Sequence, residues 1–404
     1  MINRRHAITS GLTLAALAAL PTAALADTLP PAIGRDERLR RLDKARGLMR
    51  QNGIGVVVIE PGSSLDYFTG VQWWRSERIT AALIFASGDP VIVTPFFEKP
   101  SVSQTLGIPA SVRTWNEDES PIALMASIIR ERRAAGAVGI EETVRFFIND
   151  GLGKALPGTK LVSANPVVRG CRMIKSASEL ALMQAASDIT IAAIGATMTQ
   201  VRVGMTPDDI NAILTREHQS RGGSGGDGLV LLGEAAAYPH GSHAPQHVAE
   251  REIILIDVGC TVHGYQSDIS RSYVLGGPTP DQQKVFDQVR RGQQIAMTTA
   301  RVGVAAGAVD DAVRHQYEAW GYGPGYALPG TSHRTGHGIG MDGHEPVNLV
   351  HGEATKLAAG MCFSNEPGIY VPGKFGIRVE DCFHITAAGP KWFSIPQETL
   401  AYSG

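Results

Sequence analysis

The chain has few cysteines for its length. It contains four cysteines in 404 residues, and no two of them form a CxxC pair. So sparse a set excludes the disulfide framework that holds many small secreted domains together. Three of the four lie in apolar runs typical of β-strands, so we expect buried free thiols rather than bridges. The cysteines are Cys171, Cys260, Cys362 and Cys382.

The chain also lacks an excess of charge of either sign. It has 37 Lys and Arg residues against 39 Asp and Glu residues, which gives a formal net charge of −2. Such a balance offers no electrostatic basis for binding nucleic acid or an anionic membrane. We therefore expect no nucleic-acid partner.

The apolar run at the N-terminus is too short to span a bilayer. Arg4 and Arg5 precede it, and residues 24–26 (ALA) have the small-x-small form of a cleavage site. Residues 1–26 are therefore interpreted as an export signal, which predicts a periplasmic mature protein without a membrane anchor. The paired arginines resemble a twin-arginine signal, but His6-Ala7 departs from the usual hydrophobic pair, so Sec export stays open.

The remaining chain divides into two parts at about residue 170. Residues 27–170 alternate short predicted strands and helices, which indicates a small α/β domain. This part contains neither a phosphate loop nor a cluster of ligand-type residues, and Trp73-Trp74 is its conspicuous surface candidate. The predicted helices are 36–53 and 123–135, and the predicted strands are 54–59, 65–70, 80–86, 91–95 and 138–141.

The second part, residues 171–404, opens with helices that carry capping signals. The first helix begins at Ser176 or Ser178, with Ser178 as the expected N-cap, and ends near Gly204. Thr206 and Thr279 each precede a proline, and an acid or amide follows three positions after each threonine. This pattern predicts two N-caps with proline in the first turn.

A weak internal repeat links these helices. Residues 202–204 (RVG) recur at 301–303, a shift of 99 residues, and the same shift places Gly222 on Gly321. Each copy reads as helix, Val-Gly turn, helix, glycine stop and strands. This similarity suggests a duplication, with a site between two pseudo-equivalent halves.

A hairpin is predicted over residues 253–276. Asp257 and Asp268 lie eleven residues apart in this stretch, with a His-Gly-Tyr turn between them. A β-hairpin can direct both carboxylates at one point, where they would repel each other unless a cation lay between them. Alternatively, Asp257 only ends a strand and Asp268 only starts a turn.

Further candidate ligands follow in the second part. Together with His337, Glu366 and Glu380, the two aspartates give four carboxylates and one imidazole. This donor set suits manganese, cobalt or zinc better than a metal that prefers thiolates. Two divalent ions and a hydroxide would bring the total charge to about −1, which is less costly to bury than the charge of about −2 left by one ion.

These residues carry a resemblance to a known family. The segments IDVGCTVHGYQSDISRS, HRTGHGIGMDGHEP, NEPGIY and GIRVED resemble motifs of the aminopeptidase P, prolidase and creatinase superfamily of "pita-bread" metallohydrolases. The similarity runs from Arg172 to about Pro390, and the first part, with LDYFTG, resembles that superfamily's N-terminal domain more loosely. The resemblance implies an α+β fold, in which a pita-bread catalytic domain with an internal pseudo-repeat follows a creatinase-type α/β domain.

The resemblance also implies roles for the five ligands. Asp257 would bind one metal ion, His337 and Glu366 the other, and Asp268 and Glu380 would bridge the two. The implied cofactors are two divalent ions, with manganese expected and cobalt or zinc as alternatives. The implied mechanism is attack by a metal-bridging hydroxide, while Glu366 acts as base and then as acid.

Five more residues match family positions. By resemblance, His240, His333 and His344 would hold the substrate and stabilise the tetrahedral intermediate. Tyr370 and Arg378 fall where the family has supporting or substrate-carboxylate contacts. Two alternatives stay open: His240 is merely a solvated loop histidine like its neighbours, and Arg378 supports the site by pairing with Asp381 or Glu380. The neighbouring histidines are His243 and His247.

The implied activity is hydrolysis of the Xaa-Pro bond in small peptides, as an Xaa-Pro dipeptidase or as aminopeptidase P. One alternative is a metal-dependent amidohydrolase of a small C–N substrate on the same fold, of the creatinase or ectoine-derivative type. Another is a non-catalytic binding protein, which the complete ligand set disfavours. The resemblance further implies a homodimer, although the sequence itself indicates no interface.

Overall fold

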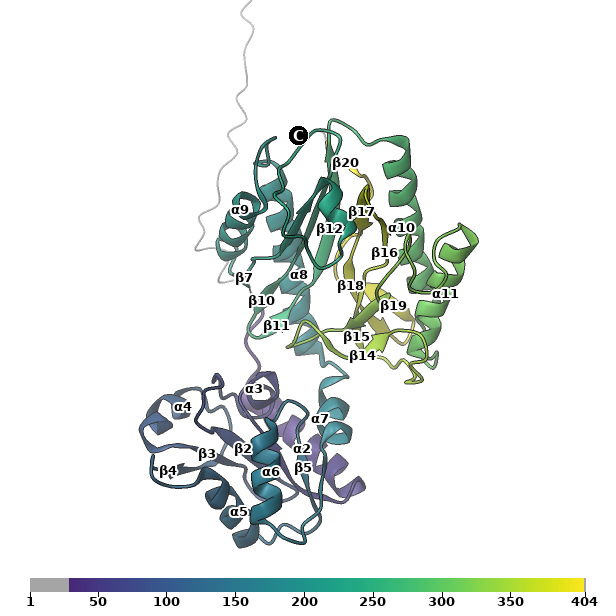
Figure 1. The fold of residues 1–404 in the computed structure, drawn as a ribbon. Helices are drawn as coiled ribbons and strands as arrows, with labels where there is room; N and C mark the ends of the chain where they lie inside the picture. Colours follow the sequence, from purple (N-terminus) through teal and green to yellow (C-terminus); the bar gives the residue numbers. More distant parts are fainter. Residues whose placement is uncertain (1–28, 403–404) are drawn as a thin grey trace, which may run out of the picture.

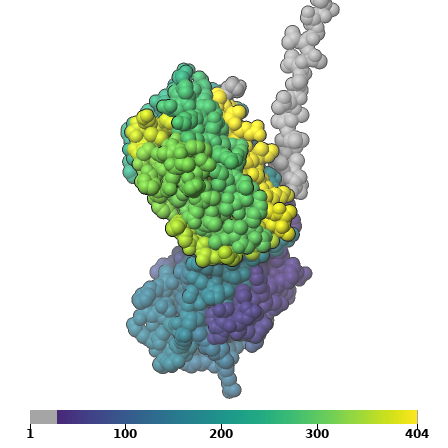
Figure 2. Space-filling view, turned by 90° about the vertical axis from the view of Figure 1, so that its right-hand side faces the viewer, coloured from purple at the N-terminus to yellow at the C-terminus, as the bar shows by residue number. Residues whose placement is uncertain are grey.

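The computed structural model describes residues 29–402, which form two lobes in direct contact (Figures 1 and 2). The first lobe, purple to blue-teal, lies below the second lobe, teal to yellow, in both views. The predicted export signal at residues 1–26 lies outside the described residues.

The first lobe is a mixed β-sheet covered by helices on both faces. Its strand order is β4-β3-β2-β1-β5-β6, with β1 antiparallel to β2 and parallel to β5. Side chains alternate along β1, so Val57 packs with α2, α3 and α7, whereas Val58 packs with α5 and α6. The strands are β1 (Ile54–Ile59), β2 (Ala81–Phe85), β3 (Val91–Pro95), β4 (Ser111–Trp115), β5 (Ala137–Ile140) and β6 (Leu161–Ser163). The helices are α2 (Arg35–Gln51), α3 (Ser63–Thr69), α4 (Lys99–Thr105), α5 (Pro121–Glu131), α6 (Phe146–Ala155) and α7 (Asn165–Arg172).

One predicted element of this lobe is wrong. Residues 65–70 were expected to form a strand, but residues 65–69 belong to helix α3, and Gly70 is its C-cap in the left-handed conformation with φ 81°. Tyr67, Phe68 and Thr69 are residues that favour strands. Six of the seven residues of α3 are buried, so packing in this segment overrides their intrinsic preference.

The second lobe contains two main sheets with four helices around them (Figure 1). The sheet β20-β12-β9-β8 carries helices α8 and α9, and the sheet β14-β13-β15-β18-β19 lies beside α10 and α11. The helices are α8 (Ala177–Met198), α9 (Pro207–Gln219), α10 (Pro280–Thr299) and α11 (Ala306–Ala319). The strands of the first half are β7 (Ser224–Gly225), β8 (Leu229–Leu232), β9 (Ile253–Val258), β10 (Cys260–Val262), β11 (Tyr265–Gln266) and β12 (Ile269–Leu275). Those of the second half are β13 (Gly336–Gly338), β14 (Glu345–Leu349), β15 (Cys362–Asn365), β16 (Gly368–Val371), β17 (Phe375–Arg378), β18 (Asp381–Thr386), β19 (Gly389–Trp392) and β20 (Ala401–Tyr402).

The helix starts follow the capping pattern, with one correction. Thr206 and Thr279 are N-caps with proline in the first turn, as predicted. The N-cap of α8 is Ser176, whose hydroxyl accepts from the amide of Glu179 in a reciprocal capping box. The expectation that Ser178 is the cap is therefore wrong, because the glutamate that completes the box lies three residues after Ser176.

The internal repeat is visible in the backbone. Gly204 and Gly303 have φ 91° and 85°, and Gly222 and Gly321 have φ 88° and 89°. Equivalent turns therefore use glycine in the same left-handed conformation, which other residues rarely adopt. Two copies of a helix–turn–helix–strand unit thus build the second lobe.

Helix α8 is the one helix among residues 29–402 that is long and apolar enough to cross a membrane. Half of its apolar window is buried, and its residues Leu182 and Ala186 belong to an apolar core that both lobes share. These features are those of a core helix. The same core holds all four cysteines, and each is a buried free thiol, as predicted.

Candidate metal centre

The two aspartates lie on neighbouring strands of the predicted hairpin. Strands β9 and β12 pair antiparallel with Val258 opposite Ile269, which places Asp257 at the end of β9 and Asp268 just before β12. The pair β10–β11 forms the turn between them. One oxygen from each aspartate lies within 4.8 Å of an oxygen of Glu380. The hairpin prediction is confirmed, and the two carboxylates point at one place.

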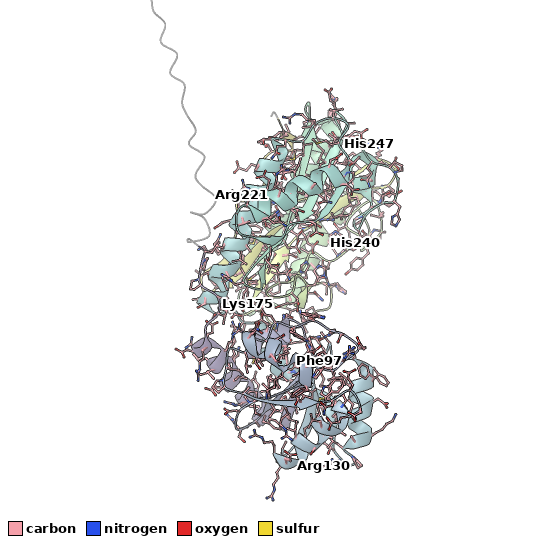
Figure 3. The ribbon with its side chains drawn as sticks, turned by 90° about the vertical axis from the view of Figure 1, so that its left-hand side faces the viewer. Phe97, Arg130, Lys175, Arg221, His240 and His247 are labelled. Carbon is pink, nitrogen blue, oxygen red and sulfur yellow. The ribbon has the colours of Figure 1, made fainter. Side chains whose placement is uncertain are left out.

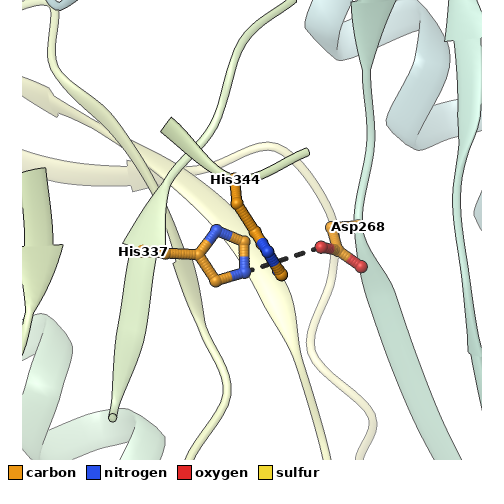
Figure 4. A group of neighbouring side chains, drawn as sticks. All are labelled: Asp268, His337 and His344. Atoms are coloured by element: carbon orange, nitrogen blue, oxygen red, sulfur yellow. Dashed lines mark ion pairs between the residues drawn. The ribbon is translucent and has the colours of Figure 1, made fainter. Parts of the chain in front are cut away.

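The second main sheet supplies the remaining candidate ligands. Glu366 directly follows β15, and Glu380 directly precedes β18, which pairs antiparallel with β15. Antiparallel pairing places the end of one strand beside the start of the other, so the two glutamates meet. His337 on β13 completes the group, with Nε2 3.3 Å from Glu366 Oε1. The same nitrogen lies 3.6 Å from Asp268 Oδ2, the contact dashed in Figure 4. The structure thus brings together all five residues that the sequence analysis singled out.

The imidazole of His337 is oriented as a metal ligand. Its Nδ1 lies 3.1 Å from the carbonyl oxygen of Gly338, which can only accept, so Nδ1 carries the proton. The Nε2 lone pair therefore faces the carboxylates of Asp268 and Glu366. Two such electron-rich groups repel each other unless a cation lies between them.

The carboxylates themselves also require positive charge. Burial, together with repulsion from neighbouring carboxylates, raises the pKa of Asp268 and Glu380 well above the usual range. The pKa of Glu366 rises to about 7, mainly because of burial. Glu380 Oε1 is buried without a hydrogen-bond partner within residues 29–402. The donor set, its charge and this unpartnered oxygen fit bound divalent cations.

Arg378 supports the site through Asp257 and does not pair with Glu380 or Asp381. Its Nη2 donates to Asp257 Oδ2 at 2.6 Å, and its Nε donates to Ser270 Oγ at 3.0 Å. The alternative in which it supports the site by pairing with Asp381 or Glu380 is wrong in its partner, because Arg271 binds Asp381 at 2.6 Å and Ser270 Oγ donates to Glu380 Oε2 at 2.8 Å. Arg378 is buried between β9 and β12 on one side and Tyr370 of β16 on the other. Its guanidinium therefore positions Asp257 and is not free for a substrate.

Tyr370 and His333 continue this hydrogen-bond chain. Arg378 Nη1 donates to the Tyr370 hydroxyl at 2.9 Å, and that hydroxyl lies 2.8 Å from His333 Nε2. His333 Nδ1 lies 2.8 Å from the carbonyl oxygen of Arg334, so it carries the proton and Tyr370 donates to Nε2. Burial lowers the pKa of His333 to about 3, and the ring stays neutral. Both ring nitrogens are therefore engaged within the protein.

His240 and His344 are the histidines whose rings remain available. Neither side chain has a hydrogen-bond partner within the described part of the chain, and both line the cavity above the carboxylates. The His344 ring packs edge-on against His337 with centroids 4.0 Å apart (Figure 4). His243 and His247 are exposed and border a separate groove, so of the three neighbouring histidines only His240 reaches the cavity. In Figure 3, His240 lies nearer the lobe junction than His247.

The cavity also contains a residue that the sequence analysis missed. It has a volume of about 420 Å³, in the size range of small-molecule sites. Arg334 lines it, and its guanidinium has no hydrogen bond or ion pair to any residue between 29 and 402. Its place between two candidate histidines in HRTGH was the signal that could have identified it. The lining residues are His240, Asp257, Asp268, His333, Arg334, His337, His344, Val350, Glu366, Arg378 and Glu380.

A second group that was missed supports the His333 loop from behind. Asp310 on α11 accepts from the backbone amide of Thr335 at 3.1 Å, from its hydroxyl at 2.7 Å and from Arg314 Nε at 2.8 Å. Glu366 in turn donates its backbone amide to Thr335. In sequence, an Asp–Arg pair four residues apart on a helix resembles an ordinary surface pair. Only the fold shows that this pair is buried against the site.

A carboxylate–imidazole centre between two pseudo-equivalent halves, preceded by a smaller α/β lobe, defines the pita-bread metallohydrolases. Comparison with known proteins agrees with this class. Residues 181–387 match the family model "Metallopeptidase family M24", and residues 41–174 match "Creatinase/Prolidase N-terminal domain". The chain belongs to metallopeptidase family M24.

Similar proteins support the same assignment. The Xaa-Pro dipeptidase of Lactobacillus delbrueckii subsp. lactis is 30% identical over 371 residues, covering 89% of this chain and 98% of that protein. The crystal structure of dipeptidase PepE from Mycobacterium ulcerans has a TM-score of 0.83 and 31% identity, covering 92% of this chain and 99% of that one. The X-Pro aminopeptidase of Thermotoga maritima has a TM-score of 0.78 and 26% identity, covering 92% and 100%. The protein is therefore a metallopeptidase, and the predicted fold is confirmed.

Proposed function

We propose that this metallopeptidase cleaves the peptide bond before proline, using two divalent metal ions. The observation that carries the proposal is the set of five donors, complete and convergent, beneath a small cavity lined by His240 and His344. The similar proteins named as Xaa-Pro dipeptidase and X-Pro aminopeptidase support the choice of bond. Proline lacks an N–H and its ring fixes φ, so a dedicated pocket is needed to accept it.

Each donor has a proposed place in the metal centre. Asp257 would hold one ion, His337 and Glu366 the other, and Asp268 and Glu380 would contact both. Oxygen-rich ligation with one nitrogen favours manganese, with cobalt and zinc as alternatives. When bound, two divalent ions lower the pKa of a water molecule and polarise the scissile carbonyl.

The residues of the chain then handle the protons. Glu366 borders the cavity with 14% of its side chain exposed, so it can take a proton from the attacking water and return it to the leaving nitrogen. His344 and His240 have ring nitrogens free to hydrogen-bond the developing oxyanion and the substrate backbone. His333 acts indirectly, because both of its ring nitrogens are hydrogen-bonded within the protein, to the Tyr370 hydroxyl and to the Arg334 carbonyl oxygen.

Arg334 favours substrates that end in a free carboxylate. Two guanidinium groups line the cavity, and only that of Arg334 is without a carboxylate partner within residues 29–402. A permanently charged, planar guanidinium is well suited to bind a terminal carboxylate with two hydrogen bonds. This geometry supports an Xaa-Pro dipeptidase over an aminopeptidase P, which acts on longer peptides.

Replacing Arg334 with glutamine is expected to separate two substrates. The value of kcat/KM for an Xaa-Pro dipeptide should fall about 10- to 100-fold, because a charge-assisted hydrogen bond is lost. The value for the corresponding Xaa-Pro amide, which has no carboxylate, should change less than about threefold. Steady-state kinetics on both substrates check this result. An equal loss on both would show that Arg334 does not read the carboxylate.

The function itself is tested with the mature chain from Asp27, loaded with manganese. An Xaa-Pro dipeptide and an Xaa-Pro-Xaa tripeptide are offered side by side. We expect cleavage of the dipeptide; cleavage of the tripeptide alone would indicate an aminopeptidase P. Cleavage of neither, with metal bound, would refute the proposal. It would favour the alternative, an amidohydrolase of a small C–N substrate, for which a cavity of about 420 Å³ is also large enough.

We further propose export to the periplasm through residues 1–26 and assembly as a homodimer. Fractionation of cells that produce the full chain tests the first proposal, since mature protein in the cytoplasm alone would refute it.

Trp73 and Trp74, the candidate interface residues, have ring centroids 4.4 Å apart in a stacked arrangement, and Trp74 is 67% exposed. Exposed stacked aromatic residues are common at interfaces. A monomeric mass at micromolar concentration would refute the dimer.

A further inference from the structure

The loop that carries His344 is closed by the residue next to it. Glu345 Oε1 accepts hydrogen bonds from the backbone amides of Met341 at 3.0 Å and Asp342 at 3.2 Å. The carboxylate of Glu345 thereby ties the start of the loop to its end. His344 has no side-chain hydrogen bond of its own within the described residues, so its position depends on this loop and on packing against His337.

A guanidinium from the end of the first lobe holds this loop. Arg172 Nη2 donates to Glu345 Oε1 at 2.5 Å and to Asp342 Oδ2 at 2.8 Å. Its other terminal nitrogen, Nη1, donates to the hydroxyls of Ser63 and Ser64 on α3, each at 2.9 Å. One side chain thus joins a helix of the first lobe to the loop of His344 in the second. The matched family segments place Arg172 in the N-terminal domain and Glu345 in the peptidase domain.

This connection is buried and strongly charged. The side chain of Arg172 is 11% exposed and that of Glu345 is 5% exposed. Lys175 adds a second cation, with Nζ 2.9 Å from Glu345 Oε2 (Figure 3 labels Lys175 where the lobes meet). Burial alone would raise the pKa of Glu345, but Lys175 and Arg172 outweigh it and lower the pKa to about 2. A buried carboxylate with this many directed contacts has one preferred geometry.

We propose that Arg172 is a positioning residue, through which the first lobe sets the place of His344 in the cavity. The inference rests on the proposed contact of His344 with substrate. Without Arg172, Asp342 keeps only the hydrogen bond from the Ser63 hydroxyl, and Lys175 is the one cation left on Glu345, so the loop gains alternative positions. The metal ligands would be unaffected, because none of them contacts Arg172. The first lobe thereby acts on the catalytic cavity within the same chain.

The test compares Arg172→Met with Arg169→Met. Arg169 lies three residues earlier on the same helix α7 and pairs with Glu142; within residues 29–402 it makes no hydrogen bond or ion pair to Asp342 or Glu345. Arg172→Met should lower kcat/KM on an Xaa-Pro dipeptide about 30-fold, whereas Arg169→Met should stay within about twofold. Both proteins should bind the same amount of manganese. If Arg172→Met retains wild-type kinetics, the proposal is wrong.

A double-mutant cycle separates positioning from a general structural effect. In a His344→Ala background, Arg172→Met should cost less than about threefold in kcat/KM, because the residue it positions is gone. Losses that multiply would contradict the proposal. Arg172→Lys retains the charge but not the two terminal nitrogens of the guanidinium, so it should recover part of the activity. It replaces Arg172→Met in these tests if the methionine variant does not fold.

Hydrogen exchange gives a readout that does not depend on catalysis. The amides of Met341 and Asp342, which bond Glu345, should exchange faster in Arg172→Met and at the wild-type rate in Arg169→Met. Unchanged exchange in Arg172→Met would overturn the proposal. If the wild-type protein cleaves no Xaa-Pro bond, the proposed function fails, and the exchange experiment still decides whether Arg172 holds the loop.

Discussion

Replacing Glu366 with glutamine is expected to lower kcat on an Xaa-Pro dipeptide by about 10²- to 10⁴-fold. A glutamine side chain cannot take a proton from the attacking water or return it to the leaving nitrogen. The substitution also removes one negative charge from the proposed ligand set, so we expect weaker metal binding as well. Steady-state kinetics at saturating manganese, with the metal content measured in parallel, separate the two effects.

Glu398→Gln is a matched control, because Glu398 is an exposed glutamate that does not line the cavity. This variant should retain wild-type kinetics. An unchanged thermal unfolding temperature in both variants would exclude a folding defect. If Glu366→Gln with its full metal content kept more than about one-tenth of the wild-type kcat, Glu366 would not be the proton-transferring group.

Metal removal is expected to make folding stability depend on pH. In the metal-free protein, burial and neighbouring carboxylates raise the pKa values of Asp268 and Glu380, and burial raises that of Glu366 to about 7. The folded protein then holds protons that the unfolded chain has already lost. The stability that these protons give the folded state is fully present below the pKa of the group in the unfolded chain, which is 4.5 for a glutamate. It is lost as the pH rises through the pKa of the group in the folded protein. Stability should therefore fall between about pH 4.5 and pH 7.

The size of this effect follows from the shift of Glu366 alone. One pKa unit corresponds to about 1.4 kcal/mol, so this carboxylate should destabilise the metal-free protein by roughly 3 kcal/mol at neutral pH. Manganese should remove most of the dependence, because cations neutralise the carboxylates. Denaturant unfolding at pH 5 and pH 8, with chelator and with manganese, measures the difference. Equal stability of the chelated protein at both pH values would contradict this account of the site.

Residue type and order in the sequence were sufficient to single out the five candidate ligands that the structure brings together. Asp257 and Asp268 flank a turn in an apolar β-context, and few arrangements other than a hairpin bring such a pair together. His337, Glu366 and Glu380 are charged or polar residues next to apolar strands, where their burial needs a reason. The helix caps at Thr206 and Thr279 were predictable for a similar reason, because capping depends on residues three positions apart.

The sequence did not predict which groups pair over long distances. Arg378 bonds Asp257, which is 121 residues away, although the nearby Asp381 and Glu380 were the expected partners. Arg172 bonds Glu345 at a separation of 173 residues. A charged residue in a sequence has many possible partners of opposite charge, and only the packing of the two sheets and the two lobes selects one. Helix α3 was missed because burial, not the residues' intrinsic preference, decides its conformation.

The most direct test is the rate of Xaa-Pro dipeptide cleavage as manganese is added to the chelated mature chain. We predict negligible activity without metal and a rise that ends at two bound ions per chain, counted by elemental analysis of the same samples. Full activity in the chelated protein would contradict the metal-dependent mechanism, and saturation at one ion per chain would contradict the dinuclear centre.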